Sequence, residues 1–445
     1  MLYTTATNRG LRPLGAEPSR LEWIAAIFVV IVQQGAFVST PLVLSDPSSF
    51  ALQDIRNPFN TAGIVISVVA MGIVCFPWIR QIGFLALHNR SSLLFMLIVL
   101  MSVTWSMHPD LTIRRGIGYV LTMLIAAYLT FRFDVVDRMK VLSAAFAIAA
   151  IGSVAFVAAL PEYGIMQDGD LAGAWRGIFA HKNHFGPVMA VAVFTELFLL
   201  VAGRGQPRWR FASLSTYFAL VVLSHSDTAL LLSLAYVAGT CVYLLWQRDR
   251  LMGIGISIAI VSFLCAALVV VWNDPAFALG VLGRDTTLTG RTELWHAINT
   301  LIEQRPVLGW GYRAMFQAND ASTAVIERVA SWGAGSSHNA FLEITLELGL
   351  VGAGVMLVII VTALRRGLRC CTAGILPLGW FSLMFFVGAI LAGQTMETLG
   401  ENQLIEWLVF NVLIFSCGLG LASRGEAGPA KVRRRLVRTM MAVPQ

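Results

Sequence analysis

Long apolar runs recur along almost the whole chain, separated by short polar segments. Most of them reach about 17–25 residues, the length that a helix needs to cross the hydrocarbon core of a bilayer. None alternates polar and apolar residues as a barrel strand does, so an all-α polytopic membrane protein is expected. The pattern predicts about twelve membrane-spanning helices, at residues 22–44, 61–79, 91–107, 114–131, 139–160, 184–203, 211–225, 228–246, 252–272, 338–364, 373–393 and 403–422.

These spans divide the chain into five parts. They are a cytoplasmic N-terminal segment (1–21), spans one to nine (22–272), one long outer loop with an amphipathic helix (273–337), spans ten to twelve (338–422) and a basic cytoplasmic tail (423–445). The first twenty residues lack the apolar core and small-residue cleavage site of a signal peptide, so the first span is expected to be retained.

Composition agrees with a lipid environment. The chain is 57% hydrophobic and 13% charged, and its mean hydropathy is +0.73, whereas roughly a quarter of the residues of a soluble domain are charged. The six cysteines lie in or beside spans and none has CxxC spacing. Neither a disulfide framework nor a zinc site is therefore indicated.

Most of the 32 lysines and arginines fall in alternate connections, which predicts that both termini are cytoplasmic. The formal charge of +7 then follows from topology and anionic lipids, and no nucleic-acid partner is needed to explain it. The basic residues that break this rule lie on the predicted outer side: Arg56, Arg114, Arg115, Arg176, Lys182, Arg284, Arg291, Arg305, Arg313 and Arg328.

The long outer loop contains the sequence TELWHAINTLIEQ, which predicts a short amphipathic helix on the membrane surface. Its apolar residues have helical spacing: Leu294, Trp295, Ile298, Leu301 and Ile302. Arg291 stands at the start of this helix, where the dipole disfavours a cation, so an anionic group is expected nearby. The glycines and proline of RPVLGWGY then predict a tight turn.

The loop ends in GAGSSHNAFLEITLELGLVG, where Ser336 or Ser337 is a candidate cap for span ten. His338 would then lie in the first helical turn, where the dipole favours a neutral imidazole that accepts a proton. Asn339, Glu343 and Glu347 follow at intervals of four and share one helix face. Carboxylates inside an apolar span predict a polar pocket that opens outward.

A second polar group, in GIFAHKNHFGP, contains His181, Lys182, Asn183 and His184 just after Arg176. Arg176 and Lys182 are candidate anion ligands, although interfacial anchoring would also explain them. The HxxH spacing would suit a metal, but no third ligand is near in sequence. A cap role without chemistry is the alternative for His338.

The ordered set of motifs resembles the O-antigen ligase and polymerase superfamily of bacterial inner-membrane glycosyltransferases. The motifs are SVTWSMHPD with two following arginines, RGIFAHKNHFG, LSHSDTALL, GRTELW, PVLGWGY and SHNAFLEITLELGLVG, across roughly residues 100–360. The HKN version of the second motif is most similar to exopolysaccharide polymerases of the succinoglycan type.

The resemblance implies a GT-C-like fold and an active site on the periplasmic face of the inner membrane. It implies transfer of an undecaprenyl-diphosphate-linked glycan to a sugar hydroxyl, without metal or other cofactor and with inversion. The acceptor would be another carrier-linked glycan in a polymerase or lipid A–core in a ligase, and the residues leave this choice open. The expected partners are the glycan donor and acceptor and membrane lipids, with a chain-length regulator as a further candidate.

By the same resemblance, Arg176 and Arg291 match the arginines proposed to hold the diphosphate, and His338 matches the proposed base or orienting group. The remaining candidate substrate contacts in these motifs are Lys182, Asn183, Arg114, Arg115, Asn339 and Tyr312.

Two other classes of function compete with a glycosyltransferase. A multi-span transporter of a polar or lipid-linked substrate would also have buried carboxylates, but the sequence has no repeated halves with interrupted helices. An intramembrane protease would pair Ser224 or Ser226 with His338, but no GxSxG-like turn is present. A carrier predicts a site near the midplane, and an enzyme of this kind predicts one at the outer end.

Overall fold

The computed structural model describes residues 17–36, 58–167, 169–257, 259, 262, 291–316, 335–402 and 404–424. Over these residues the chain is helical, apart from turns and one isolated antiparallel bridge between Ile165 and Trp175. The helices are α1 (Arg20–Gln33), α3 (Pro58–Cys75), η2 (Phe76–Trp78), α4 (Ile79–His88), α5 (Arg90–Met101), η3 (Ser102–Thr104), α6 (Pro109–Arg132), α7 (Val135–Ala159), α8 (Pro161–Gly164), η4 (Gly169–Leu171), α9 (Lys182–Val201), α10 (Pro207–Leu223), α11 (Asp227–Arg248), α14 (Arg291–Gln304), α16 (Ala340–Thr372), α17 (Leu376–Ala392) and α18 (Ile405–Ser423).

Six helical stretches of the described chain are long and apolar enough to cross a membrane, so the prediction of an all-helical polytopic membrane protein is confirmed. They are Val65–His88, Val135–Ala159, Lys182–Val201, Asp227–Arg248, Ala340–Thr372 and Ile405–Ser423.

The predicted number of about twelve spans is not established. Four predicted spans correspond to the shorter helices α1, α5, α10 and α17, and a fifth corresponds to α6, which begins with charged residues. The predicted span 252–272 lies mostly outside the described residues.

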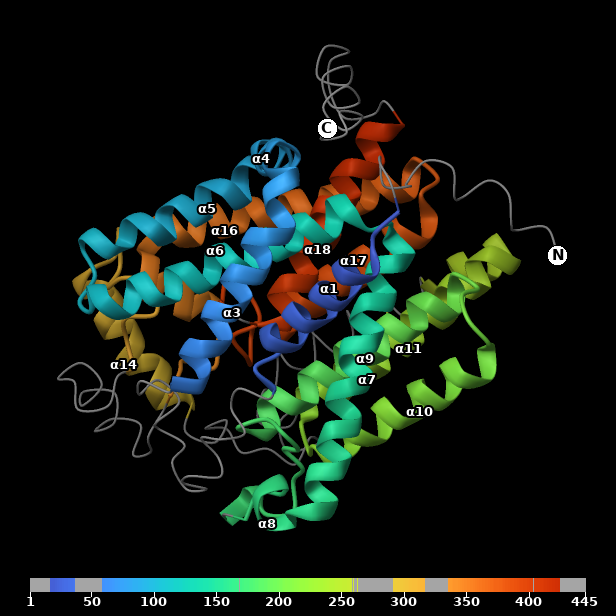
Figure 1. Ribbon diagram of the computed structural model, residues 1–445, viewed down its shortest axis with the longest axis horizontal. Helices are drawn as coiled ribbons and strands as arrows, with labels where there is room; N and C mark the ends of the chain where they lie inside the picture. The colour runs from blue at the N-terminus through green and yellow to red at the C-terminus, as the bar shows by residue number, and fades with distance from the viewer. Residues whose placement is uncertain are drawn as a thin grey trace.

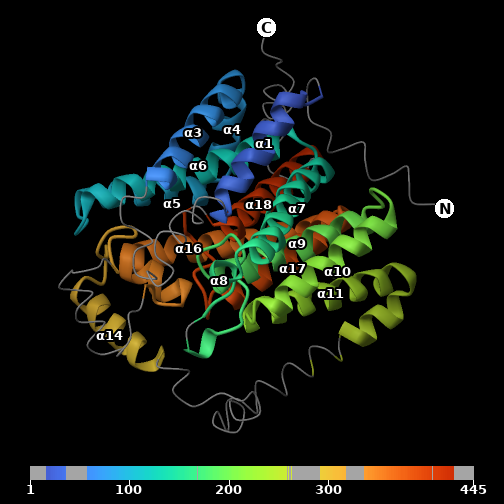
Figure 2. The same cartoon turned by 60° about the horizontal axis from the view of Figure 1, so that its bottom comes forward.

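Helices α9 and α18 form the centre of the bundle (Figures 1 and 2). Of their most apolar windows, 83% and 89% are buried within the protein. Both are apolar on all faces, which is the pattern of a helix surrounded by others. α9 packs against α7, α10, α11, α17 and α18, and α18 packs against α6, α16 and α17. The two helices therefore provide a fixed frame for the loops at their ends.

α16 is two helical pieces joined at Gly349, where φ is 65° and ψ is −166°. This left-handed backbone conformation suits glycine because a side chain there would clash with the backbone. The break also brings another segment very close, since a Cβ on Gly349 would lie 2.2 Å from the carbonyl oxygen of Val307. The turn after α14 thus packs directly into the break.

That turn, residues 305–311, satisfies the backbone groups that the break leaves without helical partners. Inside an apolar bundle each unsatisfied group would cost about several kcal/mol, so non-helical backbone needs such partners. The hydrogen bonds run from Trp310 N to Leu346 O (3.0 Å), Gly311 N to Glu347 O (2.8 Å), Leu350 N to Pro306 O (2.8 Å) and Val351 N to Val307 O (3.2 Å).

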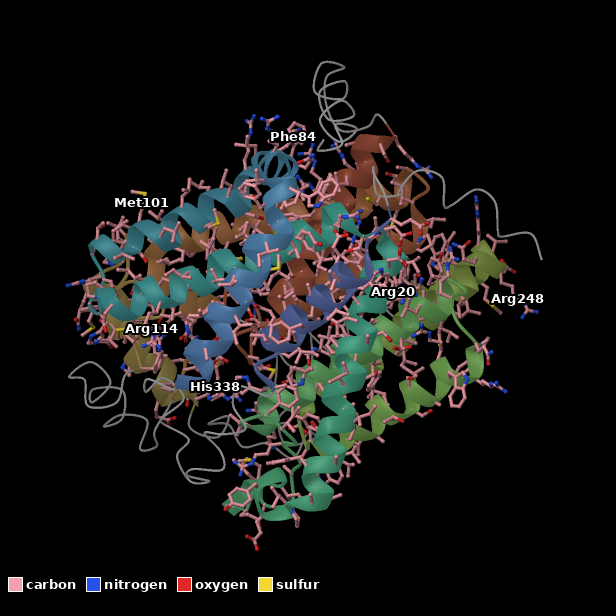
Figure 3. The ribbon with its side chains drawn as sticks, in the orientation of Figure 1. Arg20, Phe84, Met101, Arg114, Arg248 and His338 are labelled. Carbon is pink, nitrogen blue, oxygen red and sulfur yellow. The ribbon has the colours of Figure 1, made fainter. Side chains whose placement is uncertain are left out.

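The opposite end of the bundle is closed by arginines that bind across helices. Arg366 of α16 donates to the carbonyl oxygens of His88 and Ile414, each at 3.1 Å. Arg132, at the end of α6, pairs with Glu22 at the start of α1. Figure 3 places Arg20 and Arg248 toward this side of the molecule, and His338 and Arg114 toward α14. The two ends of the bundle therefore differ in composition.

Replacing Gly349 with alanine is expected to destabilise the protein, by roughly 1–3 kcal/mol from the backbone conformation alone, with the overlap at Val307 in addition. Gly354→Ala is the matched control, because a Cβ at this position of α16 meets nothing within 4 Å. Thermal unfolding of the detergent-solubilised protein measures the effect. Equal melting temperatures for the two variants would contradict this account of the break.

Candidate functional site

The turn before α16 places His338 outside the helix. The N-cap is Asn339, whose side-chain oxygen accepts from the backbone N–H groups of Phe341 and Leu342 at 3.0 and 3.2 Å. The prediction that Ser336 or Ser337 caps the helix, with His338 in its first turn, is therefore wrong. Serine and asparagine cap equally well, and here the Ser337 hydroxyl instead donates to the carbonyl of Asn339.

His338 is held in a left-handed conformation, with φ of 51°. Such a conformation is uncommon for a residue other than glycine and persists where the surroundings hold it. Its backbone N–H donates to Glu397 Oε1 at 2.8 Å, and its ring nitrogen Nδ1 lies 3.7 Å from the same oxygen. The Ser336 hydroxyl also donates to that carboxylate. Glu397 thus binds the turn at two points, the Ser336 hydroxyl and the His338 backbone N–H.

Burial lowers the pKa of His338 below its ordinary value of 6.5, and the charge of Arg291 lowers it further, while Glu397 opposes the shift. The lowered pKa agrees with the predicted neutral imidazole. The main cause of the shift is burial rather than the helix dipole. Burial tends to raise the pKa of Glu397, but the charge of His338 and the Ser336 hydroxyl lower it overall, so this side chain is a carboxylate at neutral pH.

Arg291 is the first residue of α14, as the spacing of the loop predicted. The apolar face of α14 is buried against Leu346 and Met315, so this helix packs on the protein. The Arg291 guanidinium donates to the carbonyl oxygen of Thr395 at 3.3 Å. Thr395 lies two residues before Glu397, so the 393–402 segment between α17 and α18 joins Arg291 to His338.

The HKN segment forms the start of α9. Its N-cap is His181, whose Nδ1 accepts from the backbone N–H of Asn183 at 3.1 Å. The Lys182 ammonium donates to the carbonyl of His225 at 2.9 Å. Arg176 is only 4% exposed, and its Nε donates to the carbonyl of Tyr163 at 2.6 Å.

The charges around His181 link this segment to His338. Its pKa falls to about 2, first because of burial and then because His184, Lys182, His338 and Arg176 place positive charge near it. Arg176, Lys182 and His338, which are far apart in sequence, therefore lie within electrostatic reach of one imidazole. With Arg291 beside His338, the predicted cations and the predicted base gather at one end of the bundle.

An HxxH metal site receives no support from this geometry, because Nδ1 of His181 already accepts from the backbone. Among the described residues, no group of three or more His, Cys, Asp and Glu side chains is arranged to hold a metal ion.

Four other residues were predicted to contact the substrate, and they differ in exposure and in the bonds that they already make. Arg114 is exposed on α6, whereas Arg115 is buried. Tyr312 is 1% exposed and its hydroxyl donates to the carbonyl of Gly400 at 2.9 Å, so a substrate does not reach it in this conformation. The Asn339 side chain caps α16 and donates to the Gln394 carbonyl at 3.4 Å.

Sequence analysis did not single out Glu397 or Glu401, and it noted Arg313 only as a basic residue on the predicted outer side. The Arg313 guanidinium lies 2.8 Å from Glu401 Oε1 and 3.8 Å from Glu343 Oε1. The signal for the two missed glutamates was the sequence TMETLGEN, which places carboxylates between two strongly apolar runs. Glu343, on the polar face predicted for span ten, thus lies close to a basic side chain.

Known proteins share these segments. A family model described as O-Antigen ligase matches residues 211–357, which include Arg291, Arg313 and His338. The exopolysaccharide production protein ExoQ of Rhizobium meliloti (strain 1021) is 25% identical over 281 residues, which cover 60% of this chain. The match spans 63% of that relative's length.

The two roles considered for Asn339, helix cap and substrate contact, can be separated by substitution. Asn339→Ala removes the cap and is expected to cost about 0.5–2 kcal/mol of stability. Asn339→Ser keeps a capping oxygen and is expected to retain both stability and activity. Thermal unfolding and glycan transfer are measured for both variants. A serine variant that folds normally but is inactive would instead favour substrate contact by the amide.

Proposed function

We propose that the chain, which matches the O-antigen ligase family model over residues 211–357 and is similar to ExoQ, is a glycosyltransferase that moves a glycan from undecaprenyl diphosphate to a sugar hydroxyl. The proposed site faces the periplasm of a bacterial inner membrane. The observation that carries the proposal is that Arg291 lies near the half-buried, neutral His338, while Arg176, Lys182 and His338 all lie within electrostatic reach of His181.

The leaving group of this reaction is a lipid diphosphate, whose negative charge grows as the glycosidic bond breaks. Arg291, Arg176 and Lys182 are proposed to neutralise that charge, and a guanidinium suits it because its planar fork donates two parallel bonds. Fixed cations aimed at developing charge are typically worth about several kcal/mol of barrier. They would supply this stabilisation without a metal ion.

The acceptor hydroxyl oxygen attacks the anomeric carbon, and the bond from that carbon to the diphosphate oxygen breaks with inversion. The hydroxyl proton passes to a ring nitrogen of His338. Glu397, whose Oε1 lies 3.7 Å from Nδ1 of His338, stabilises the resulting imidazolium. General-base catalysis of this kind contributes about 10²–10⁴ in rate.

We propose that the protein is a polymerase, in which the acceptor is another carrier-linked glycan. The exopolysaccharide production named for the Rhizobium relative favours this choice over the second candidate, a ligase that uses lipid A–core. A carrier is disfavoured because carriers place their sites near the bilayer midplane at a repeat interface, whereas His338 and Arg291 lie at helix ends.

His338→Ala and Arg291→Ala are each expected to abolish chain extension while the protein still inserts at normal levels. The loss follows from removing the proton acceptor or a diphosphate ligand. His296→Ala and Arg305→Ala are matched controls on and just after α14, and both should extend chains normally. Polymer length is measured by gel electrophoresis of membranes supplied with lipid-linked repeats. Wild-type polymer in either site variant would refute its assigned role.

The pH profile gives an independent test of His338. The base must be neutral to accept a proton, and burial holds its pKa below 6.5. Activity should therefore stay level as pH falls to 6.5 and decline only at lower pH. In Glu397→Gln the imidazolium loses its stabilising charge, so the pKa falls and the acid limb moves to still lower pH, at a reduced maximal rate. An acid limb that moves upward in this variant would contradict the assigned contact.

A further inference from the structure

Below the His338 turn lies a charged cluster that the proposed chemistry does not use. It is formed by Arg313, Glu343, Glu347 and Glu401, from the turn after α14, from α16 and from the segment before α18. Glu343 and Glu347 are 5% and 3% exposed. Removing a charge from water into an apolar interior costs about several kcal/mol unless a partner compensates it. The cluster therefore depends on its arginine.

Arg313 contacts all three carboxylates. Its guanidinium lies 2.8 Å from Glu401 Oε1 and 3.8 Å from Glu343 Oε1, and its backbone N–H bonds to the Glu347 carboxylate. Burial raises the pKa of Glu401 to about 8, and Arg313 opposes that shift. The residue itself has a φ of 53°, so its own backbone is in the left-handed region.

Glu343 connects the cluster to the turn that contains His338. While Glu343 Oε1 faces Arg313, its Oε2 accepts from the backbone N–H of Ser337 at 2.8 Å. Ser337 immediately precedes His338, whose own N–H is taken by Glu397. The left-handed turn thus has two successive backbone N–H groups on two carboxylates, and one of these carboxylates is held by Arg313.

We propose that Arg313 is a positioning residue for His338, which acts by holding Glu343 on the N–H of Ser337. This assignment rests on the proposed function for its kinetic consequence. A misplacement of about 1 Å in a reacting group can slow a reaction roughly 10²-fold. Arg313 needs no contact with the substrate to have such an effect.

Kinetics of five variants, including Glu343→Ala alone, test the proposal. Arg313→Gln is expected to lower kcat about 10–100-fold with little change in KM for the lipid-linked donor, and Arg313→Lys should recover part of the loss. Arg305→Gln is the control: its side chain lies on the same turn but faces the Trp105 carbonyl and the Trp310 ring. The double variant Arg313→Gln with Glu343→Ala should be no slower than the slower of the two single variants. The reason is that both substitutions break the same chain of contacts from Arg313 through Glu343 to the His338 turn.

Wild-type kcat in Arg313→Gln, or losses that multiply in the double variant, would overturn the proposal. If Arg313→Gln does not fold, Arg313→Gln with Glu401→Gln removes both partners of the 2.8 Å pair and leaves fewer uncompensated charges. This folded double variant must still have low kcat, and normal turnover would count against the proposal.

Hydrogen–deuterium exchange separates this proposal from the proposed function. Peptides covering residues 335–342 should exchange faster in Arg313→Gln than in wild type or Arg305→Gln, whether or not the protein transfers glycans. Unchanged exchange would refute the positioning role alone. Absence of glycan transfer by the wild-type protein would refute the proposed function alone.

Discussion

Charge and polar backbone buried at one end of an apolar bundle must find partners inside the protein, because lipid offers none. The turn after α14 meets most of this demand. Its backbone at residues 306–311 satisfies the break at Gly349, and Arg313, two residues later, compensates the carboxylates of α16. The two functions are adjacent in sequence because the break and the carboxylates are adjacent on α16. One short segment therefore determines both the path of α16 and the position of its polar face.

The same constraint divides the cations into two kinds. Arg313 lies against the carboxyl groups of Glu343 and Glu401. Arg176, Lys182 and Arg291 each donate to a backbone carbonyl, of Tyr163, His225 and Thr395. A backbone carbonyl orients a cation, so these three contacts help to fix where the positive charges lie.

Much of the fold could be predicted from local pattern, and the errors have identifiable causes. The apolar face of α14 follows from residue spacing, but that face was expected to lie on the membrane surface, whereas the structure packs Leu294, Ile298 and Leu301 against Met315 and Leu346. The cap of α16 was misplaced because Ser336, Ser337 and Asn339 all suit an N-cap, and only their contacts distinguish them. The break at Gly349 leaves no signal in an apolar run, since its partner lies about forty residues earlier. Glu397 was missed for the same reason, because the turn that it binds precedes a different helix.

These errors bear on how the proposed base works. A histidine in the first turn of a helix would be kept neutral by the dipole, and the helix alone would fix its orientation. A histidine in a left-handed turn before the helix depends instead on the carboxylates that bind the turn, Glu343 and Glu397. Glu343 lies 3.8 Å from the Arg313 guanidinium, and the charge of His338 and the Ser336 hydroxyl lower the pKa of Glu397. The position of the base is therefore coupled to the electrostatic balance of the whole end of the bundle, and a bound diphosphate that draws on the same cations would change that balance at the moment of reaction.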